Sequence, residues 1–179
     1  MKTSQDYPLE IDAVAAPGSP GRIGMTFCPG KKQRGAMTGD WNRDLTLDLE
    51  AIRAWGATVI VNLIQDHEMT DLGVQDTAKH LPVDVAYIRL PIPDFGVPDA
   101  GWHEQWQTEG PALLARLRAG ESIVLHCKGG LGRTGMIAAR MLVELGCTPQ
   151  ASITAVRQAR SGTIETREQE AYVEAIKHG

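Results

Sequence analysis

The chain has 179 residues, of which 42% are hydrophobic and 22% are charged, and these proportions are ordinary for one soluble globular domain. A net charge of −4 at pH 7 argues against general binding to nucleic acid or to a membrane surface. The sequence has no apolar run of about 18 residues, so it predicts no membrane insertion, and residues 1–10 lack the apolar core of a signal peptide.

The cysteine and histidine content gives a second set of expectations. Cys28, Cys127 and Cys147 are an odd and sparse set, which is typical of reduced thiols, so we expect a cytoplasmic protein. His67, His80, His103 and His178 show no metal-ligand spacing, and we predict neither a metal nor another cofactor. No pattern in the sequence indicates an oligomeric state.

Helical and strand patterns alternate along most of the chain. Prolines and glycines over residues 17–21 indicate an irregular leader over residues 1–22, followed by one domain over residues 23–179. Spacing of the apolar residues predicts the following elements in chain order: a helix at 45–55, strands at 58–63 and 85–92, a helix at 102–118, a strand at 122–126, and helices at 134–145, 148–160 and 166–177. This order argues for an α/β sandwich around a short sheet.

The loop between the strand ending at His126 and the helix beginning at Thr134 has the composition of a phosphate cradle. Three glycines let the backbone curl until successive N–H groups converge on one point, where the next helix also presents its unpaired N–H groups. Arg133 offers two parallel donors for two phosphate oxygens. We therefore assign phosphate binding to Lys128, Gly129, Gly130, Leu131, Gly132 and Arg133.

Cys127 is the candidate nucleophile of this loop. The loop N–H groups, the helix N-terminus and Arg133 all favour the reactive thiolate. Thr134 can donate its hydroxyl to the sulfur when the thiolate becomes the leaving group. We expect His126 to order the loop by hydrogen bonding, since an ionised thiol needs no base. A glycine-rich turn that only joins a strand to a helix would not need this cysteine and arginine together.

The loop resembles the His-Cys-x5-Arg-Ser/Thr signature of the protein tyrosine phosphatase superfamily. The length suits a compact dual-specificity-type domain, and the chain looks more closely like the cyclin-dependent-kinase-associated phosphatase group. The supporting segments are 26–32 (Thr-Phe-Cys-Pro-Gly-Lys-Lys), 91–94 (Pro-Ile-Pro-Asp), 129–133 (Gly-Gly-Leu-Gly-Arg) and 162–166 (Gly-Thr-Ile-Glu-Thr). The resemblance covers about residues 22–178 and implies a three-layer sandwich with a short, mostly parallel sheet and helices on both faces.

The resemblance also implies a phosphoprotein phosphatase that acts through a phosphocysteine without a cofactor. A carboxylic acid must protonate the leaving oxygen, and the loop of residues 91–99 offers Asp94 and Asp99. Family position favours Asp94, whereas Asp99 precedes a predicted helix and suits an N-cap. Gln169 matches a glutamine that helps to position the attacking water in related phosphatases, but Thr166 and Gln169 also fit a capping box.

Several other residues have more than one possible role. Cys28 could form a protective disulfide with Cys127, as in some relatives, although a buried inert thiol is the simpler role. Lys31, Lys32 and Arg34 form a basic cluster that is either a substrate-binding surface or an ordinary solvated run. We expect a structural role for Cys147. Trp102 and Trp106 lie four residues apart and are expected in the core or on a docking surface.

The alternatives to a phosphoprotein substrate come from other users of similar loops. Lipid phosphatases acting on phosphoinositides carry a second lysine where this chain has Leu131, so the pocket has less charge for a polyphosphorylated headgroup. An acidic chain makes an RNA channel less suitable. The loops of rhodanese-type sulfurtransferases usually have fewer residues or lack the Arg-Thr-Gly exit, and they need no aspartate loop. An inactive phosphobinding module would be expected to lose Cys127 or Arg133.

Overall fold

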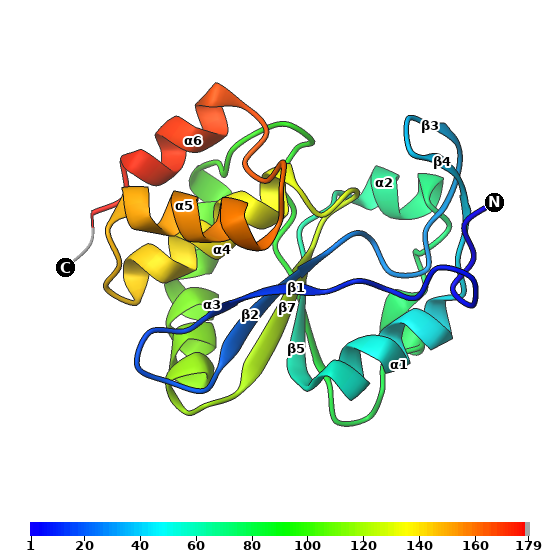
Figure 1. The fold of residues 1–179 in the computed structure, drawn as a ribbon, viewed down its shortest axis with the longest axis horizontal. Helices are drawn as coiled ribbons and strands as arrows, with labels where there is room; N and C mark the ends of the chain where they lie inside the picture. Colours follow the sequence, from blue (N-terminus) through cyan, green and yellow to red (C-terminus); the bar gives the residue numbers. More distant parts are fainter. Residues whose placement is uncertain (178–179) are drawn as a thin grey trace.

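A five-stranded sheet in the order β1-β2-β7-β5-β6 runs through the computed structural model, which describes residues 1–177 (Figure 1). The hairpin β3–β4 stands apart from this sheet. The described elements are β1 (Asp12–Ala15), β2 (Arg22–Thr26), β3 (Lys32–Ala36), β4 (Gly39–Asn42), α1 (Leu45–Trp55), β5 (Ala57–Asn62), α2 (Asp66–Asp71), η1 (Thr77–Lys79), β6 (Ala86–Arg89), α3 (Ala100–Arg118), β7 (Ser122–His126), α4 (Gly132–Glu144), α5 (Pro149–Ala159) and α6 (Arg167–Glu174).

The sheet is mostly parallel, as predicted. β7 lies between β2 and β5 and pairs in parallel with both, β6 pairs in parallel with β5, and only β1 is antiparallel to its neighbour β2. Thr26 and Asn62 both stand opposite His126 in the register. Three neighbouring strands therefore end at one edge of the sheet, where α/β folds place their ligands, and Cys127 is the next residue after that edge.

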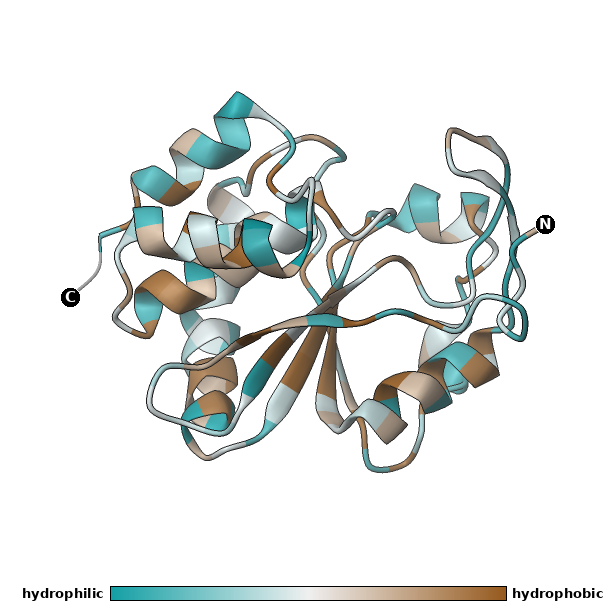
Figure 2. Cartoon of the chain, in the orientation of Figure 1, coloured by the Kyte–Doolittle hydropathy of each residue, from teal (hydrophilic) through white to brown (hydrophobic). Residues whose placement is uncertain are grey.

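Alternate side chains of the central strands enter two separate cores. Ile60 and Val124 pack with Leu49 and Ile52 of α1 on one face. Their chain neighbours on β5 and β7 face the other way and pack with the helices α3, α4, α5 and α6 (Figure 1). Apolar residues are concentrated on these strands (Figure 2). Because side chains alternate along a strand, an apolar run such as residues 57–62 indicates burial on both faces.

The helices predicted at 45–55 and 148–160 begin and end within one residue of the prediction, whereas the helix predicted at 134–145 begins at Gly132 and the one predicted at 166–177 ends at Glu174. Asp44 caps α1 by accepting from the N–H of Leu47, and Gly56 ends the helix in the left-handed conformation with a φ of 113°. Thr148 caps α5, whose first residue is Pro149. No described helix has both the length and the apolar composition needed to cross a membrane.

The start of the chain differs from the expectation. The expected irregular leader over residues 1–22 contains β1, which adds to the edge of the sheet, so the irregular description is wrong for residues 12–15. β1 has only four residues and its burial does not alternate cleanly, which leaves a weak strand signal. Because a boundary at residue 22 separates two hydrogen-bonded strands, we propose that the domain includes β1.

Candidate active site

Cys127 lies at the carboxyl edge of the sheet, directly after β7. The residue is 3% exposed, and its Sγ accepts a hydrogen bond from the N–H of Gly130 at 3.2 Å. Gly130 has a φ of +74°, and a Cβ at this position would lie 2.4 Å from the backbone of Thr26. Only glycine fits this close approach, and the resulting turn directs an N–H at the sulfur.

The carbonyl groups of the loop point away from Cys127 and are held from outside. Lys128 O accepts from the N–H of Cys28 at 3.2 Å. Arg160 donates from Nε to Gly130 O at 2.8 Å and from Nη2 to Gly129 O at 3.2 Å. Because the N–H and C=O groups of a peptide unit point in opposite directions, these contacts turn the loop N–H groups inward.

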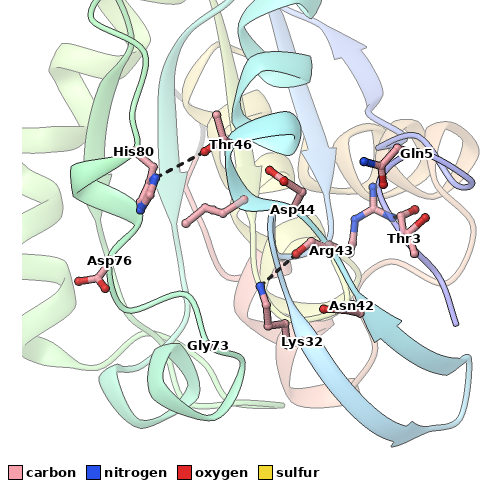
Figure 3. A pocket seen from close by; sticks show the side chains of 11 residues that line it. Thr3, Gln5, Lys32, Asn42, Arg43, Asp44, Thr46, Gly73, Asp76 and His80 are labelled. Atoms are coloured by element: carbon pink, nitrogen blue, oxygen red, sulfur yellow. Dashed lines mark hydrogen bonds between the residues drawn. The ribbon is translucent and has the colours of Figure 1, made fainter.

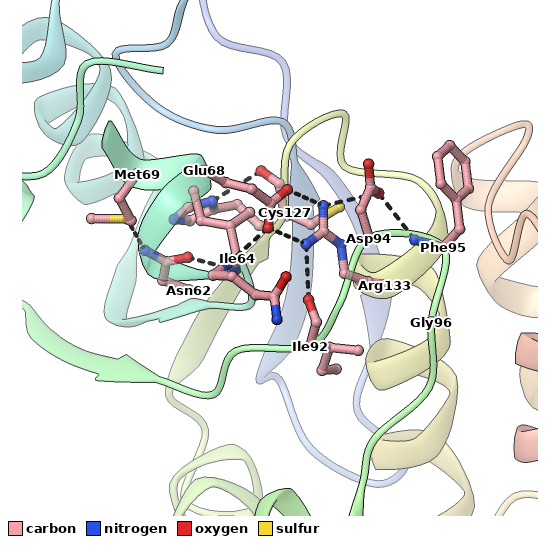
Figure 4. A network of polar contacts seen from close by, with 12 residues as sticks. Asn62, Ile64, Glu68, Met69, Ile92, Asp94, Phe95, Gly96, Cys127 and Arg133 are labelled. Carbon is pink, nitrogen blue, oxygen red and sulfur yellow. Dashed lines mark hydrogen bonds and ion pairs between the residues drawn. The ribbon is translucent and has the colours of Figure 1, made fainter. Parts of the chain in front are cut away.

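Arg133 follows the loop in the first turn of α4 and is the centre of a polar network (Figure 4). Its Nη1 donates to Glu68 Oε2 at 2.7 Å and to Ile92 O at 2.9 Å. Its Nη2 donates to Glu68 Oε1 at 2.8 Å and to Asp94 Oδ1 at 3.0 Å. Within the described residues no hydrogen bond uses the Nε of Arg133. The guanidinium plane is thus fixed while one donor is left free for a ligand.

Glu68 and Arg133 each stabilise the charged form of the other. Burial opposes the ionisation of Glu68, but hydrogen bonds from Arg133 and from the N–H of Gln65 outweigh it and lower the pKa of Glu68. Burial also disfavours the charged guanidinium, and the hydrogen bonds to Glu68 together with the negative charge of Cys127 reverse this and raise the pKa of Arg133. Both groups are therefore charged at neutral pH.

The structure separates the two candidate acids. Asp94 is half-exposed and faces Arg133, as Figure 4 shows. Asp99 instead caps α3, with its Oδ1 accepting from the N–H of Trp102 at 2.8 Å. Of the two carboxylates, only Asp94 makes a described contact with the phosphate-binding residues. Phe95, the next residue, is 58% exposed and has a φ of 59°, a strained conformation that is typical of functional loops.

Gln169 is fully buried and performs two tasks. Its Oε1 accepts from the N–H groups of Glu165 and Thr166, which completes the predicted capping box of α6. Its Nε2 donates to Gly96 O at 3.1 Å, which connects α6 to the loop that carries Asp94. The predicted capping role of Gln169 is confirmed, and Gln169 also contacts the loop that carries Asp94. Its effect on the attacking water stays a prediction.

Glu165 brings a carboxylate to the phosphate-binding loop. Its Oε1 accepts from the N–H of Gly132, the first residue of α4, at 2.8 Å. This N–H belongs to the group that should meet the phosphate, so an anion already occupies one donor of the loop. Among the described residues Thr134 Oγ1 has no hydrogen-bond partner, so its predicted donation to Cys127 is not formed in this structure.

His126 is a neutral hydrogen-bonding group, in keeping with the expected ordering role. Burial lowers its pKa to about 4, which leaves the imidazole uncharged at pH 7. Its Nδ1 lies 3.2 Å from Cys127 O, and a neutral ring can donate there. The imidazole therefore holds the backbone at the start of the loop.

The predicted basic cluster divides into two parts. Lys31 is buried, whereas Lys32 and Arg34 are exposed, so the three do not form one surface run. Lys32 Nζ donates to Arg43 O at 3.1 Å in a polar pocket of about 550 Å³ that does not include Cys127 (Figure 3). Hairpin β3–β4 places Trp41 against Lys31, and this contact could not be read from the local sequence.

The remaining cysteines, histidines and tryptophans have structural surroundings. Cys28 and Cys127 are both free and buried, so their disulfide stays a prediction, and Cys147 packs at the edge of the core. Trp102 and Trp106 stack at 5.0 Å inside the core, as expected. His178 lies outside the described residues. No group of three potential metal ligands occurs in the part of the chain that the structure describes.

Three functional residues were missed by the sequence reasoning. Glu68 is one, although Gln65 and Glu68 form a capping box at the start of α2 that could have drawn attention to the segment. Arg160 is another, and Asp12 of β1 holds it at 2.9 Å. The third is Glu165, which lies in the Gly-Thr-Ile-Glu-Thr segment of residues 162–166. All three act on a loop far away in the sequence.

The comparisons with known proteins agree with this geometry. Residues 36–147, more than half of the chain, match the family model described as "Polymorphic toxin system, DSP-PTPase phosphatase". Cyclin-dependent kinase inhibitor 3 of Rattus norvegicus is 28% identical over 159 residues, which cover 87% of this chain and 71% of that protein. Protein tyrosine phosphatase type IVA 3 of Homo sapiens is 26% identical over 128 residues, which cover 71% of this chain and 69% of that protein.

A solved structure shares the fold over most of its length. A kinase associated phosphatase whose catalytic-site cysteine is replaced by serine superposes with a TM-score of 0.80 at 24% identity and 93% coverage of both chains. Its similarity confirms the predicted phosphatase-type α/β sandwich. From the family match, the chain belongs to the DSP-PTPase phosphatase family described for polymorphic toxin systems, and it is a cysteine-dependent protein phosphatase of the tyrosine and dual-specificity class.

Proposed function

We propose that the chain hydrolyses phosphomonoesters on proteins with Cys127 as nucleophile, Arg133 as phosphate clamp and Asp94 as general acid and base. The observation that carries this assignment is the convergence of three groups on one point. Nη2 of Arg133 contacts Asp94 at 3.0 Å, the sulfur of Cys127 is close enough for its charge to act on Arg133, and Figure 4 shows the three side chains together. Nucleophile, clamp and acid thus come from the loop after β7, from α4 and from the loop after β6.

The reaction has two displacements at phosphorus. In the first, Sγ of Cys127 attacks phosphorus, the bond to the leaving oxygen breaks, and protonated Asp94 gives that oxygen its proton. In the second, water attacks the phosphocysteine, Asp94 takes a proton from the water, and the sulfur leaves as thiolate. Throughout both steps Arg133 and the inward N–H groups bind the equatorial oxygens.

Exposure of the acid loop supports a protein substrate. Asp94 and Phe95 are both exposed at the rim, so a phosphorylated side chain can approach without burial of the whole substrate. Phe95 also offers an apolar surface beside Asp94 for the ring of a phosphotyrosine. Phosphoinositide phosphatases carry a second lysine in this loop, and this chain has Leu131 at that position. Lys128 is therefore the one cationic residue between Cys127 and Arg133. The free thiols suit a reducing compartment, and we propose the cytoplasm.

Hydrolysis of p-nitrophenyl phosphate by wild type and Cys127→Ser, in the presence of a chelator, tests the assignment. Turnover that survives the chelator and disappears in Cys127→Ser is expected. A panel of phosphotyrosine, phosphoserine and phosphothreonine peptides, run beside short-chain phosphoinositides, then tests the substrate class. Preferred release of phosphate from the phosphoinositides would contradict the protein assignment.

A further inference from the structure

Lys31 lies behind the phosphate-binding loop and contacts its outer face. Lys31 Nζ donates to Lys128 O at 3.3 Å, and the N–H of Cys28 donates to the same oxygen at 3.2 Å. Lys128 is the first residue after Cys127. An ammonium at this carbonyl therefore fixes the peptide unit between Lys128 and Gly129, the second after the nucleophile.

The surroundings of Lys31 are apolar and aromatic. The side chain is buried, and its Nζ lies 4.1 Å from the ring centre of Trp41 and 5.0 Å from that of Phe27. Among the described residues no ion pair with a carboxylate involves Lys31. The described partners of the buried Lys31 ammonium are thus two aromatic rings and one backbone carbonyl. A buried charge without an ion pair is costly, so its presence suggests that the charge has a function.

We propose that Lys31 is a positioning residue of the phosphatase, one that holds the Lys128 carbonyl outward and supplies positive charge behind Cys127 and the bound phosphate. This inference rests on the proposed role of Cys127. Arg160 holds the next two carbonyls of the loop, Gly129 O and Gly130 O. Lysine, unlike arginine, can lose its proton within the working range of an enzyme.

The charge of Lys31 should therefore make the phosphatase sensitive to alkaline pH. Burial lowers the pKa of Lys31 to about 8, and the charge of Cys127 opposes this shift while Lys128 and Arg43 add to it. Burial raises the pKa of Cys28 strongly, so Cys28 stays a neutral thiol. Lys31 is then charged below about pH 8 and neutral above it.

The charged groups near Lys31 are two carboxylates that are already paired and a second lysine at the Trp41 ring. Asp48 of α1 accepts from Arg43 at 2.8 and 3.0 Å and from the N–H of Gly30 at 2.8 Å. Glu68 of α2 is bound to Arg133. Lys2 of the N-terminal segment lies 4.8 Å from the centre of the Trp41 ring and adds positive charge there. Both carboxylates thus have other partners, and neither forms an ion pair with Lys31.

The test compares wild type, Lys31→Met and Lys31→Arg in kcat/KM for p-nitrophenyl phosphate and in inhibition by inorganic phosphate between pH 6 and 9.5. Ratios between variants at one pH cancel the ionisation of substrate and inhibitor. We expect Lys31→Met to lose about tenfold in kcat/KM at pH 6.5, the effect of one charged hydrogen bond. The deficit should shrink above pH 8, where wild type also loses the charge. Lys31→Arg should keep its rate at pH 9.5 while wild type falls.

Lys79→Met is the control, because Lys79 is an exposed lysine that pairs with Asp76 on the surface. It should match wild type at every pH. A merely structural role of Lys31 would give Lys31→Met the same deficit at all pH values, and that result, or a wild-type rate at pH 6.5, would overturn the inference. If Lys31→Met does not fold, the comparison of wild type with Lys31→Arg decides, and equal alkaline behaviour overturns it. Turnover that persists in Cys127→Ser would instead contradict the proposed function itself.

Discussion

Glu68 and Arg133 form a buried bidentate ion pair between α2 and α4, with N–O distances of 2.7 and 2.8 Å. The two side chains are 8% and 1% exposed. Because both Nη1 and Nη2 of Arg133 bind the carboxylate of Glu68, the side-chain conformation of Arg133 is fixed before a phosphate binds. Such preorganisation means that binding does not have to order a long flexible side chain.

Replacing Glu68 with glutamine should therefore weaken both the clamp and the fold. Breaking one partner of a buried pair costs about 3–5 kcal/mol, and we expect the unfolding free energy to fall by an amount of that order. Among molecules that remain folded, kcat/KM should fall by about tenfold or more, because Arg133 is no longer held in plane. Urea unfolding and p-nitrophenyl phosphate kinetics measure the two effects.

Glu144→Gln is the matched control for this change. Glu144 pairs with Arg140 at 3.3 Å and accepts from Trp106, away from the phosphate-binding loop. The variant should lose stability but keep the kcat/KM of wild type. Equal kinetic losses in both variants would show that Glu68 acts only through general stability.

Asp94→Asn should lower turnover, and the loss should depend on the leaving group. Poorly leaving alkoxides of phosphoserine and phosphothreonine need the proton most, so a loss of about 10²–10⁴-fold is expected there, and a smaller loss with p-nitrophenyl phosphate. Asp99→Ala removes the N-cap of α3 and should lower stability by about 1 kcal/mol with little change in rate. Kinetics on both substrate types check this, and the reverse ranking would make Asp99 the acid.

The phosphate-binding loop could be predicted from sequence because everything that defines it is local. A buried strand, three glycines, an arginine and an apolar helix follow one another over residues 122–145, and each has a short-range signal. The cap residues Thr148 and Thr166 were also found from neighbours within a few positions. Alternation of strands and helices then limited the fold to a parallel α/β sheet.

What escaped prediction depends on contacts between distant segments. Glu68 and Arg133 are 65 positions apart in the sequence, and Arg160 and Gly130 are 30 positions apart. The burial of Lys31 requires the hairpin that brings Trp41 over it, and charge patterning alone indicated a surface lysine. β1 was missed for a related reason, since a short edge strand gains its stability from β2 and carries little pattern of its own.

Gln169→Glu separates the two tasks of Gln169. A carboxylate can still accept from the N–H groups of the capping box, but it cannot donate to Gly96 O. We expect faster hydrogen exchange in the loop of residues 94–98 and a several-fold lower kcat, about the effect of one neutral hydrogen bond. Thr166→Ala, which removes only the cap, should destabilise α6 and leave kcat unchanged. Wild-type exchange in Gln169→Glu would contradict the connection.

Glu165→Gln should strengthen the binding of inorganic phosphate. In wild type the Glu165 carboxylate accepts a hydrogen bond from the N–H of Gly132, and its negative charge repels a phosphate that binds to the same loop. An amide keeps the shape without the charge, so the inhibition constant for phosphate should fall by about threefold to tenfold at low salt, and less at high salt. Glu170→Gln removes the same charge from α6, where Glu170 pairs with Arg157, and should change nothing. Equal inhibition constants in both variants would rule out the repulsion.

The pH dependence of stability should report the burial of His126. Burial gives this imidazole a pKa of about 4 in the folded protein, below the value near 6.5 of an unfolded chain. Between these values the unfolded state binds a proton that the folded state does not. The stability contributed by neutral His126 is therefore complete above about pH 6.5 and is lost as the pH falls towards 4.

Urea unfolding at pH 7, 6 and 5 measures this loss, which for one group is at most about 1.4 kcal/mol per pH unit. His126→Gln should be less stable at pH 7, because the contact with Cys127 O changes, but its stability should depend less on pH than that of wild type. His80→Gln alters an exposed histidine and should keep the wild-type slope. A wild-type slope in His126→Gln would mean that the acid sensitivity comes from other groups, and that protonation of His126 does not oppose folding.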